Sequence, residues 1–225
     1  MRKIAIFGAG GFGREVLQMI RDINAAAFSS IPWDPVGFLV DTKYVNGNPV
    51  HGLPLLDPAT WLPANPDVDV VIAVGAPSTR RRIAQSIASF YDNKFATLIH
   101  PRAWIGAEVQ LGEGTIICAG CLITTDIRIG NHVHVNIGAT VGHDAQLCDF
   151  TTLNPSVNVS GNVTLSEGAE IGTGSIIIPN AHIGNWCIVG AGSVITKPAP
   201  ANATLVGAPA KVIKTRPAGW HEAIT

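Results

Sequence analysis

The 225-residue sequence has little charge of either sign, few aromatic residues and no long apolar run. Its 16 acidic and 15 basic residues leave a formal net charge of −1, which argues against binding of nucleic acid or an anionic membrane through a basic surface. No segment reaches the roughly 18 consecutive apolar residues that a membrane span needs. The apolar run after Arg2 and Lys3 is too short for a signal peptide, so we expect a cytoplasmic protein.

Cysteine is also scarce, and its four copies argue against a disulfide framework in a chain of this size. Cys118 and Cys121 have the CxxC spacing of a redox pair or of half a zinc site. No second CxxC follows, so we expect these cysteines to be small buried residues. Glycine, in contrast, is abundant with 24 residues, which suits a compact fold with many tight turns.

The first third of the chain alternates strand and helix patterns. Apolar runs at 4–7, 36–40 and 68–74 predict buried strands, and the spacing of apolar residues over 14–23 predicts a helix followed by a loop over 25–35. Residues 77–79 begin a further helix. Residues 1–95 are therefore expected to form an α/β domain of βαβ type, a Rossmann-like half without the second half that would hold a nicotinamide nucleotide.

The sequence GAGGFG at residues 8–13 follows the first strand. Gly8, Gly10 and Gly13 have the spacing of the dinucleotide fingerprint, and helix-start amides favour an anion. A tight strand-to-helix turn selects glycine for steric reasons alone, so phosphate binding and a structural turn both remain open. Asp41 ends the second strand, where a ribose-binding acid or a turn residue would fit. It lies 33 residues after Gly8 instead of the usual ~20, which favours a mononucleotide.

From residue 99 an aliphatic residue recurs every six positions without interruption. The 17 residues of this series are Ile99, Ile105, Leu111, Ile117, Ile123, Ile129, Val135, Val141, Leu147, Leu153, Val159, Leu165, Ile171, Ile177, Ile183, Val189 and Ile195. A six-residue period of this length is typical of a parallel β-helix, in which three hexads make one triangular coil.

One corner of this repeat departs from the small residues found elsewhere. His143 and Asp144 occupy it, and Asn136 lies seven residues earlier. An imidazole beside a carboxylate that orients it is suited to take a proton from a nucleophile. Metal binding is a competing use of histidine, although the close histidine spacings of two and nine do not match the usual β-helix zinc pattern. We expect His132, His134 and His182 to be exposed as well.

These motifs and the ending VGAPAK at 206–211 resemble those of the NeuD/PglD family of bacterial sugar acetyltransferases, which belong to the hexapeptide-repeat acyltransferases. The resemblance covers nearly the whole chain, including GAGGFGREV, FLVD, VIAVG and the hexads. It implies a left-handed β-helix over 96–199 and a tail over 200–225. It also implies a homotrimer with acetyl-CoA between adjacent subunits.

The resemblance further implies roles for individual residues. His143 is the expected general base and Asp144 its partner, with no metal. The N-terminal domain is expected to hold a nucleotide-linked sugar. The residues assigned to that substrate are Gly8, Gly10, Gly11, Phe12, Gly13, Asp41 and Asn136. Those assigned to acetyl-CoA are Thr152, Gly161, Thr173, Ala191 and Lys211. Phe12 and Thr152 stand where several members have histidine, and Asn136 could instead belong to a side-chain ladder.

The expected reaction is attack of a sugar amine on the thioester of acetyl-CoA while His143 removes a proton, within bacterial surface glycan biosynthesis. Backbone amides near Gly142 or Gly161 are candidates to stabilise the oxyanion. Two alternatives remain open. One is an O-acetyltransferase acting on a hydroxyl such as that of a sialic acid, and the other is a non-catalytic trimeric nucleotide-binding module. UDP, GDP, CMP and dTDP all remain possible as the nucleotide.

Overall fold

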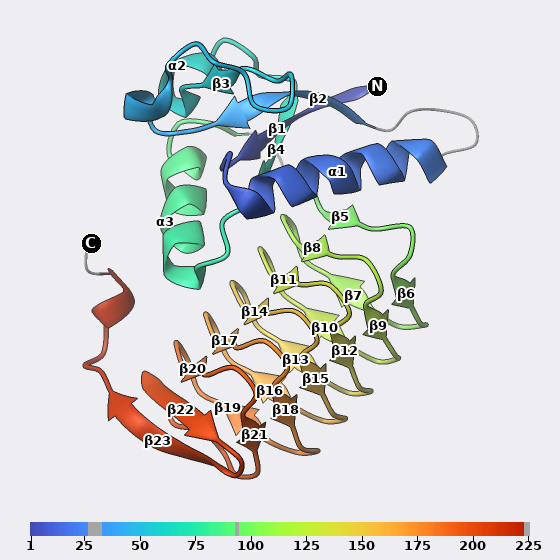
Figure 1. The fold of residues 1–225 in the computed structure, drawn as a ribbon, viewed down its shortest axis with the longest axis vertical. Helices are drawn as coiled ribbons and strands as arrows, with labels where there is room; N and C mark the ends of the chain where they lie inside the picture. The colour runs from blue at the N-terminus through green and yellow to red at the C-terminus, as the bar shows by residue number, and fades with distance from the viewer. Residues whose placement is uncertain (27–32, 93–94, 223–225) are drawn as a thin grey trace.

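A computed structural model describes residues 1–26, 33–92 and 95–222, and its chain begins in a four-stranded parallel sheet (Figure 1). The strand order is β3 (Leu55–Leu56), β2 (Trp33–Leu39), β1 (Arg2–Phe7) and β4 (Val68–Ile72). All three strand pairs are parallel. The order reverses between β1 and β4, as in one half of a doubly wound sheet, so the predicted fold of this part is confirmed.

Helices cover both faces of this sheet. α1 (Gly11–Ala26) buries Val16, Leu17 and Ile20 in the same cluster as Ile4 and Ile6 of β1. α3 (Pro77–Ala88) packs in a second cluster on the other face. The short α2 (Pro58–Trp61) and the 3-10 helix η1 (Thr42–Tyr44) lie in the segment between β2 and β4. Of the loop expected over 25–35, α1 takes the start and β2 the end, and residues 27–32 lie outside the described residues.

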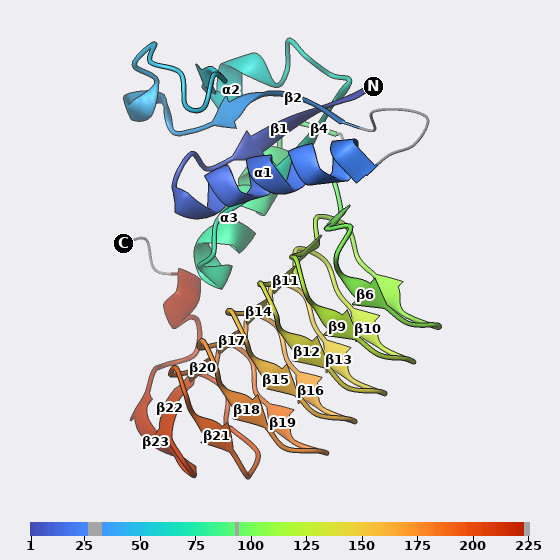
Figure 2. The same ribbon diagram turned by 45° about the vertical axis from the view of Figure 1, so that its right-hand side comes forward.

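From Leu98 the chain winds into a parallel β-helix with three faces, and each coil contributes one short strand to each face (Figure 2). The first face contains β5 (Leu98–Ile99), β8 (Ile116–Ile117), β11 (His134–Val135), β14 (Thr152–Leu153), β17 (Glu170–Ile171) and β20 (Ile188–Val189). The second face contains β6 (Trp104–Ile105), β9 (Leu122–Ile123), β12 (Thr140–Val141), β15 (Asn158–Val159), β18 (Ile176–Ile177) and β21 (Val194–Ile195). The third contains β7 (Gln110–Leu111), β10 (Arg128–Ile129), β13 (Gln146–Leu147), β16 (Thr164–Leu165) and β19 (His182–Ile183). Each of the 17 predicted aliphatic positions is the second residue of one of these strands, so the predicted hexad repeat is confirmed.

Two edges of this prism matter for the site. The Asn136 edge joins the first and second faces and comprises residues 100–103, 118–121, 136–139, 154–157, 172–175 and 190–193. The His143 edge joins the second and third faces and comprises residues 106–109, 124–127, 142–145, 160–163 and 178–181. The second face therefore separates the two edges within one chain.

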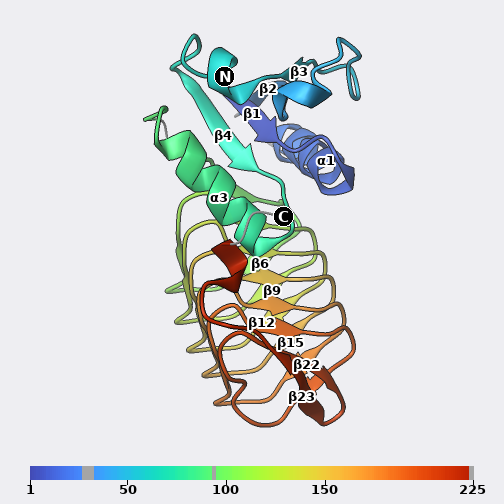
Figure 3. The ribbon, with the colours of Figure 1, turned by 90° about the vertical axis from the view of Figure 1, so that its left-hand side faces the viewer.

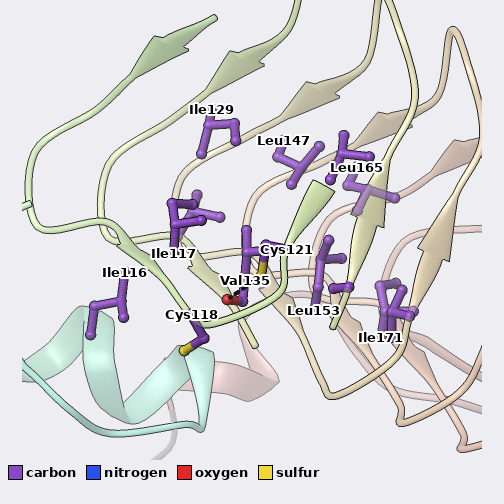
Figure 4. Close-up of a cluster of buried hydrophobic side chains, with 14 of the residues drawn as sticks. Ile116, Ile117, Cys118, Cys121, Ile129, Val135, Leu147, Leu153, Leu165 and Ile171 are labelled. Atoms are coloured by element: carbon purple, nitrogen blue, oxygen red, sulfur yellow. Dashed lines mark hydrogen bonds between the residues drawn. The ribbon is translucent and has the colours of Figure 1, made fainter. Parts of the chain in front are cut away.

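The inside of the β-helix is filled by stacked aliphatic side chains, with Val135, Leu153 and Ile171 in successive coils (Figure 4). Cys118 and Cys121 are buried at the Asn136 edge, and all four cysteines are free thiols. Burial raises the pKa of the Cys118 thiol to about 12 and that of Cys121 to about 11, so neither is a reactive thiolate. The prediction that these cysteines are small buried residues is confirmed.

The chain ends by returning to the N-terminal domain (Figure 3). β22 (Ala203–Gly207) pairs with β20, and β23 (Ala210–Thr215) closes an antiparallel hairpin with β22. The 3-10 helix η2 (Trp220–Glu222) then lies near α3. There the His221 ring stacks on Trp186 with centroids 3.8 Å apart, and its Nε2 lies 3.0 Å from Nη1 of Arg81.

A buried arginine joins the two domains. Arg80 of α3 has no exposed surface and reaches the coils beside the first face. Its guanidinium donates to the carbonyl oxygens of Val74, Gly75, His132, Phe150 and Thr151 and to the hydroxyl of Thr152, at 2.8–3.3 Å. Burial lowers the pKa of Arg80 to about 9. Two of these six hydrogen bonds, to Val74 and Gly75, stay within the N-terminal domain, and the other four anchor that domain to the coils.

This interface overturns one expectation about histidine. His132 and His134 are buried, with 6% and 1% of their surface exposed, whereas His182 is exposed as expected. The ring of His132 stacks on Phe150, and Nδ1 of His134 lies 3.2 Å from Nη1 of Arg80. The prediction that all three are exposed was wrong because the hexad repeat carries no information about which face the N-terminal domain covers. Among the described helices, none is long and apolar enough to cross a membrane.

Candidate functional site

A cleft of about 830 Å³ opens at the carboxyl ends of the parallel strands. Gly8 and Gly10 after β1, Asp41 after β2 and Val74 after β4 line it, together with one side of α3. The strand order reverses here, and in open α/β sheets ligands bind in the crevice at such a reversal. The cleft is the candidate nucleotide site.

The glycines of the 8–13 loop meet different surroundings. Gly8 has φ of +107°, and a Cβ on it would lie 3.0 Å from the carbonyl oxygen of Ala73. A Cβ on Gly13 would overlap the Gly8 carbonyl, so both glycines are required by the fold. Gly10, which lines the cleft, and Gly11, the first residue of α1, have nothing within 4 Å of an added Cβ. The open side of this turn can therefore approach a ligand closely.

Asp41 lies where a ribose-binding acid was expected. It precedes η1 but its carboxylate makes no capping hydrogen bond, and it lines the cleft with Tyr44 and Asn46. A carboxylate in this position can accept hydrogen bonds from ribose hydroxyls.

Phe12 does not line the cleft. Its ring lies 5.2 Å from that of His134, and it borders a separate recess of about 180 Å³ between α1 and the Asn136 edge. Val16 and Met19 of α1 and Ile137 of the Asn136 edge also line this recess. Phe12 is thus placed between the N-terminal domain and the coils.

His143 and Asp144 project from the His143 edge between β12 and β13. Nδ1 of His143 lies 2.7 Å from Oδ2 of Asp144, and the two side chains are 66% and 60% exposed. Beside an ionised carboxylate Nδ1 must carry the hydrogen, because two acceptors would repel each other. Nε2 is then left as the proton acceptor, and the pair has the arrangement of an oriented general base.

Gly161 lies directly against His143 in the next coil. A Cβ on Gly161 would lie 2.7 Å from Cε1 and Nε2 of the imidazole, so glycine leaves room for the ring. The amide of Gly142 donates to the carbonyl of Val159 at 2.8 Å and is not available to an oxyanion. The Gly161 amide has no acceptor among the described residues, so it is the better candidate for that role.

The remaining predicted residues do not gather around His143 in one chain. Asn136, Thr173 and Ala191 lie on the Asn136 edge. The Asn136 amide donates to the carbonyl of Leu153 at 3.0 Å, and Asn154 repeats this contact one coil later with Ile171. A side-chain ladder therefore exists here. Lys211 lies exposed on β23.

Thr152 is placed away from any solvent-facing groove. It is 1% exposed, its hydroxyl accepts from Arg80 at 2.9 Å, and it donates to the carbonyl of Gly75 at 3.1 Å. A side chain enclosed at the domain interface offers no surface to a cofactor. The expectation that Thr152 contacts acetyl-CoA does not fit this chain, because the N-terminal domain covers the first face at β14.

Sequence reasoning missed two arginines of α3. Arg80 joins the domains, and Arg82 lines the cleft. Helical spacing of residues 79, 82, 83 and 86 could have indicated a common side of α3, but not which cavity that side faces. Within the described ranges, no group of three or more His, Cys, Asp or Glu side chains is arranged to hold a metal ion.

The coils and the exposed imidazole define a transferase of the hexapeptide-repeat class. The profile of bacterial transferase hexapeptides (six repeats) matches residues 162–197, and that of the PglD N-terminal domain matches residues 3–87. The two halves of the chain thus match the two parts of one kind of enzyme.

Full-length relatives give the family. The GDP-perosamine N-acetyltransferase of Escherichia coli O157:H7 is 32% identical over 96% of this chain and 99% of its own length. WeeI from Acinetobacter baumannii AYE superposes with a TM-score of 0.83 at 30% identity, covering 93% of this chain and 99% of that structure. PerB from Caulobacter crescentus, in complex with CoA and GDP-perosamine, superposes with a TM-score of 0.81 at 28% identity. The match covers 94% of this chain and 97% of that structure. The chain belongs to the NeuD/PglD-type family of sugar acetyltransferases, and its coils form the family's left-handed β-helix.

Proposed function

We propose that the protein transfers the acetyl group of acetyl-CoA to the amino group of a nucleotide-linked amino sugar. The observation that carries this proposal is the presence of two complementary parts in one chain. A cleft opens at the strand-order reversal, and an oriented imidazole is exposed on the β-helix. N-acetylation by the E. coli relative and the CoA and GDP-perosamine in PerB support the same reaction.

The chemistry follows from the geometry of the His143 edge. The amine nitrogen attacks the thioester carbon while Nε2 of His143 accepts a proton from that nitrogen. Asp144 holds the ring through Nδ1 and stabilises the imidazolium. The carbon–sulfur bond then breaks, and the departing CoA thiolate receives the proton. The amide of Gly161 is the candidate donor to the oxyanion formed between these steps.

We also propose a homotrimer with each active site built from two chains. In one chain the second face separates His143 and Gly161 from Asn136, Thr173 and Ala191. Trp104, Leu122 and Ile176 of that face are 57%, 49% and 44% exposed, which favours self-association. A threefold ring brings one chain's His143 edge to its neighbour, where Thr173, Ala191 and Lys211 would meet acetyl-CoA.

The acceptor is tested by supplying acetyl-CoA with pooled nucleotide-linked amino sugars or with free sialic acid. Release of CoA thiol with the first pool, and an acetyl group on nitrogen by mass spectrometry, is the expected result. Acetylation of a hydroxyl would instead indicate an O-acetyltransferase. Failure to release thiol with any acceptor would favour a non-catalytic module. We further propose that the reaction takes place in the cytoplasm, upstream of bacterial surface glycan assembly.

The role of His143 is tested by His143→Ala. Loss of a general base typically lowers kcat by ~10²-fold or more, and folding should be unaffected because the side chain is exposed. His182→Ala is the matched control, since His182 is an exposed histidine on the third face. Turnover of the His143→Ala enzyme at the rate of the unchanged protein would remove His143 from the mechanism.

A further inference from the structure

Three consecutive arginines of α3 have three different surroundings. Arg80 is enclosed at the domain interface. Arg81 lies 3.4 Å from Glu167, 3.6 Å from Glu222 and 3.0 Å from His221. Arg82 is exposed, lines the cleft and makes no ion pair or side-chain hydrogen bond within the described ranges. Arg82 thus keeps its donors available for a ligand.

Arg82 gives the cleft a charged end. Among the described residues that line the cleft, Arg82 is the single basic residue and Asp41 is the single acidic residue. Asp41 follows β2 and Arg82 belongs to the helix after β4, so the loop after β1 lies between them in the strand order. Gly8 and Gly10 of that loop also line the cleft. The cleft therefore runs from a carboxylate, past backbone amides, to a guanidinium.

This order matches a nucleoside attached to a chain of phosphates. Ribose hydroxyls donate to a carboxylate, whereas phosphates are repelled by it and are attracted to helix-start amides and to arginine. A guanidinium can make two parallel hydrogen bonds to phosphate oxygens, which a lysine ammonium cannot do with the same geometry. The α1 start can hold one phosphate, and Arg82 can hold the next.

We propose that Arg82 is a substrate-binding residue that holds one phosphate of the nucleotide's diphosphate. The inference rests on the proposed function, because it assumes that the cleft holds the nucleotide. It adds to that function a residue that contacts the phosphates.

The experiment measures binding to the full-length protein by calorimetry. Each nucleoside of guanine, uracil, cytosine and thymine is compared with its monophosphate and its diphosphate. We expect the diphosphate of the preferred base to bind most tightly. Arg82→Gln should weaken that binding by roughly 10- to 100-fold, the usual range for a charge-assisted hydrogen bond, and should leave nucleoside binding unchanged.

Two further variants make the result specific. Arg82→Lys should recover part of the lost affinity, because it restores charge without the planar donor pair. Arg128→Gln removes an exposed arginine of β10, far from the cleft lining, and should bind diphosphate like the unchanged protein. Thermal unfolding of each variant checks that the fold is retained.

The outcomes separate the inference from the function on which it rests. Equal diphosphate affinity in Arg82→Gln and the unchanged protein would overturn the role of Arg82 alone. An equal loss for nucleoside and diphosphate would also overturn it, because the side chain would then act on the cleft as a whole. Absence of binding of every nucleotide to the unchanged protein would overturn the nucleotide site itself, and the inference with it.

Discussion

Gly10 and Gly13 belong to one loop but are glycine for different reasons. Gly13 packs against the Gly8 carbonyl, where a Cβ has no room, while Gly10 faces open space beside the cleft. Gly13 is therefore explained by the packing of the helix on the strand. Gly10 leaves the backbone open to a phosphate.

We predict opposite effects for alanine at these two positions. Gly13→Ala should lower the free energy of unfolding by ~1–3 kcal/mol or more, because the backbone must move to admit the methyl group. Gly10→Ala should leave the unfolding midpoint close to that of the unchanged protein but weaken nucleotide binding. Urea unfolding and calorimetry measure the two effects. Equal stability of both variants would contradict this division of the loop.

At the scale of elements, Arg80 holds α3 against the coils. Arg80→Met keeps much of the side-chain volume but removes the donors to five carbonyl oxygens and one hydroxyl. Because buried acceptors left without donors are costly, we predict a loss of roughly 3–5 kcal/mol in the free energy of unfolding. Urea denaturation measures it, with Arg128→Gln as control. An unchanged midpoint would show that water or a shift of α3 replaces these bonds.

The same interface predicts a dependence of stability on pH. Burial, followed by the charge of Arg80, lowers the pKa of His132 to about 4 from an ordinary value near 6.5, and the pKa of His134 is lowered as well. Since the unfolded chain binds these protons more readily, stability is retained above about pH 6.5. It is lost as the pH falls towards 4, with His132 alone accounting for about 3 kcal/mol.

The test is unfolding in urea at several pH values between 7 and 4. His132→Phe keeps a ring between Phe95 and Phe150 and removes the titrating group. Its stability should fall less steeply over this interval than that of the unchanged protein. Identical slopes would mean that His132 takes up no proton on unfolding, or that it is already accessible in the folded state.

At the scale of the whole molecule, the proposed trimer predicts complementation between variants. Light scattering in dilute solution should report about three times 23.6 kDa. His143→Ala damages the His143 edge, and Thr173→Arg places a bulky side chain on the Asn136 edge. Each variant alone should be inactive if acetyl-CoA lies where the two edges meet.

Mixed trimers formed from equal amounts of the two variants should regain activity at about a quarter of their sites, since a site is intact when one neighbour supplies His143 and the other Thr173. Activity of the refolded mixture, compared with each variant treated in the same way, measures this. A fully active monomer, or no recovery in mixtures that are shown to exchange subunits, would contradict the shared site.

The sequence by itself determined the architecture, because both of its signals are local. Every sixth residue must turn into the narrow interior of the coil, so the repeat is visible along the chain as an aliphatic period. In the same way, the apolar runs and the glycine loop indicate strands and a turn without reference to distant residues. The adjacency of His143 and Asp144 likewise predicted a contact that the structure contains at 2.7 Å.

Only the tertiary structure decided the surroundings of each residue, which differ even between residues of the same type. Arg80, Arg81 and Arg82 are identical neighbours in the sequence, yet they face the domain interface, the C-terminal segment and the cleft, because successive helical residues point about 100° apart. His132 and Thr152 become buried because the N-terminal domain covers the first face, whereas His143 on another edge stays exposed. These differences arise from packing between segments far apart in the chain, which a period of six residues does not record.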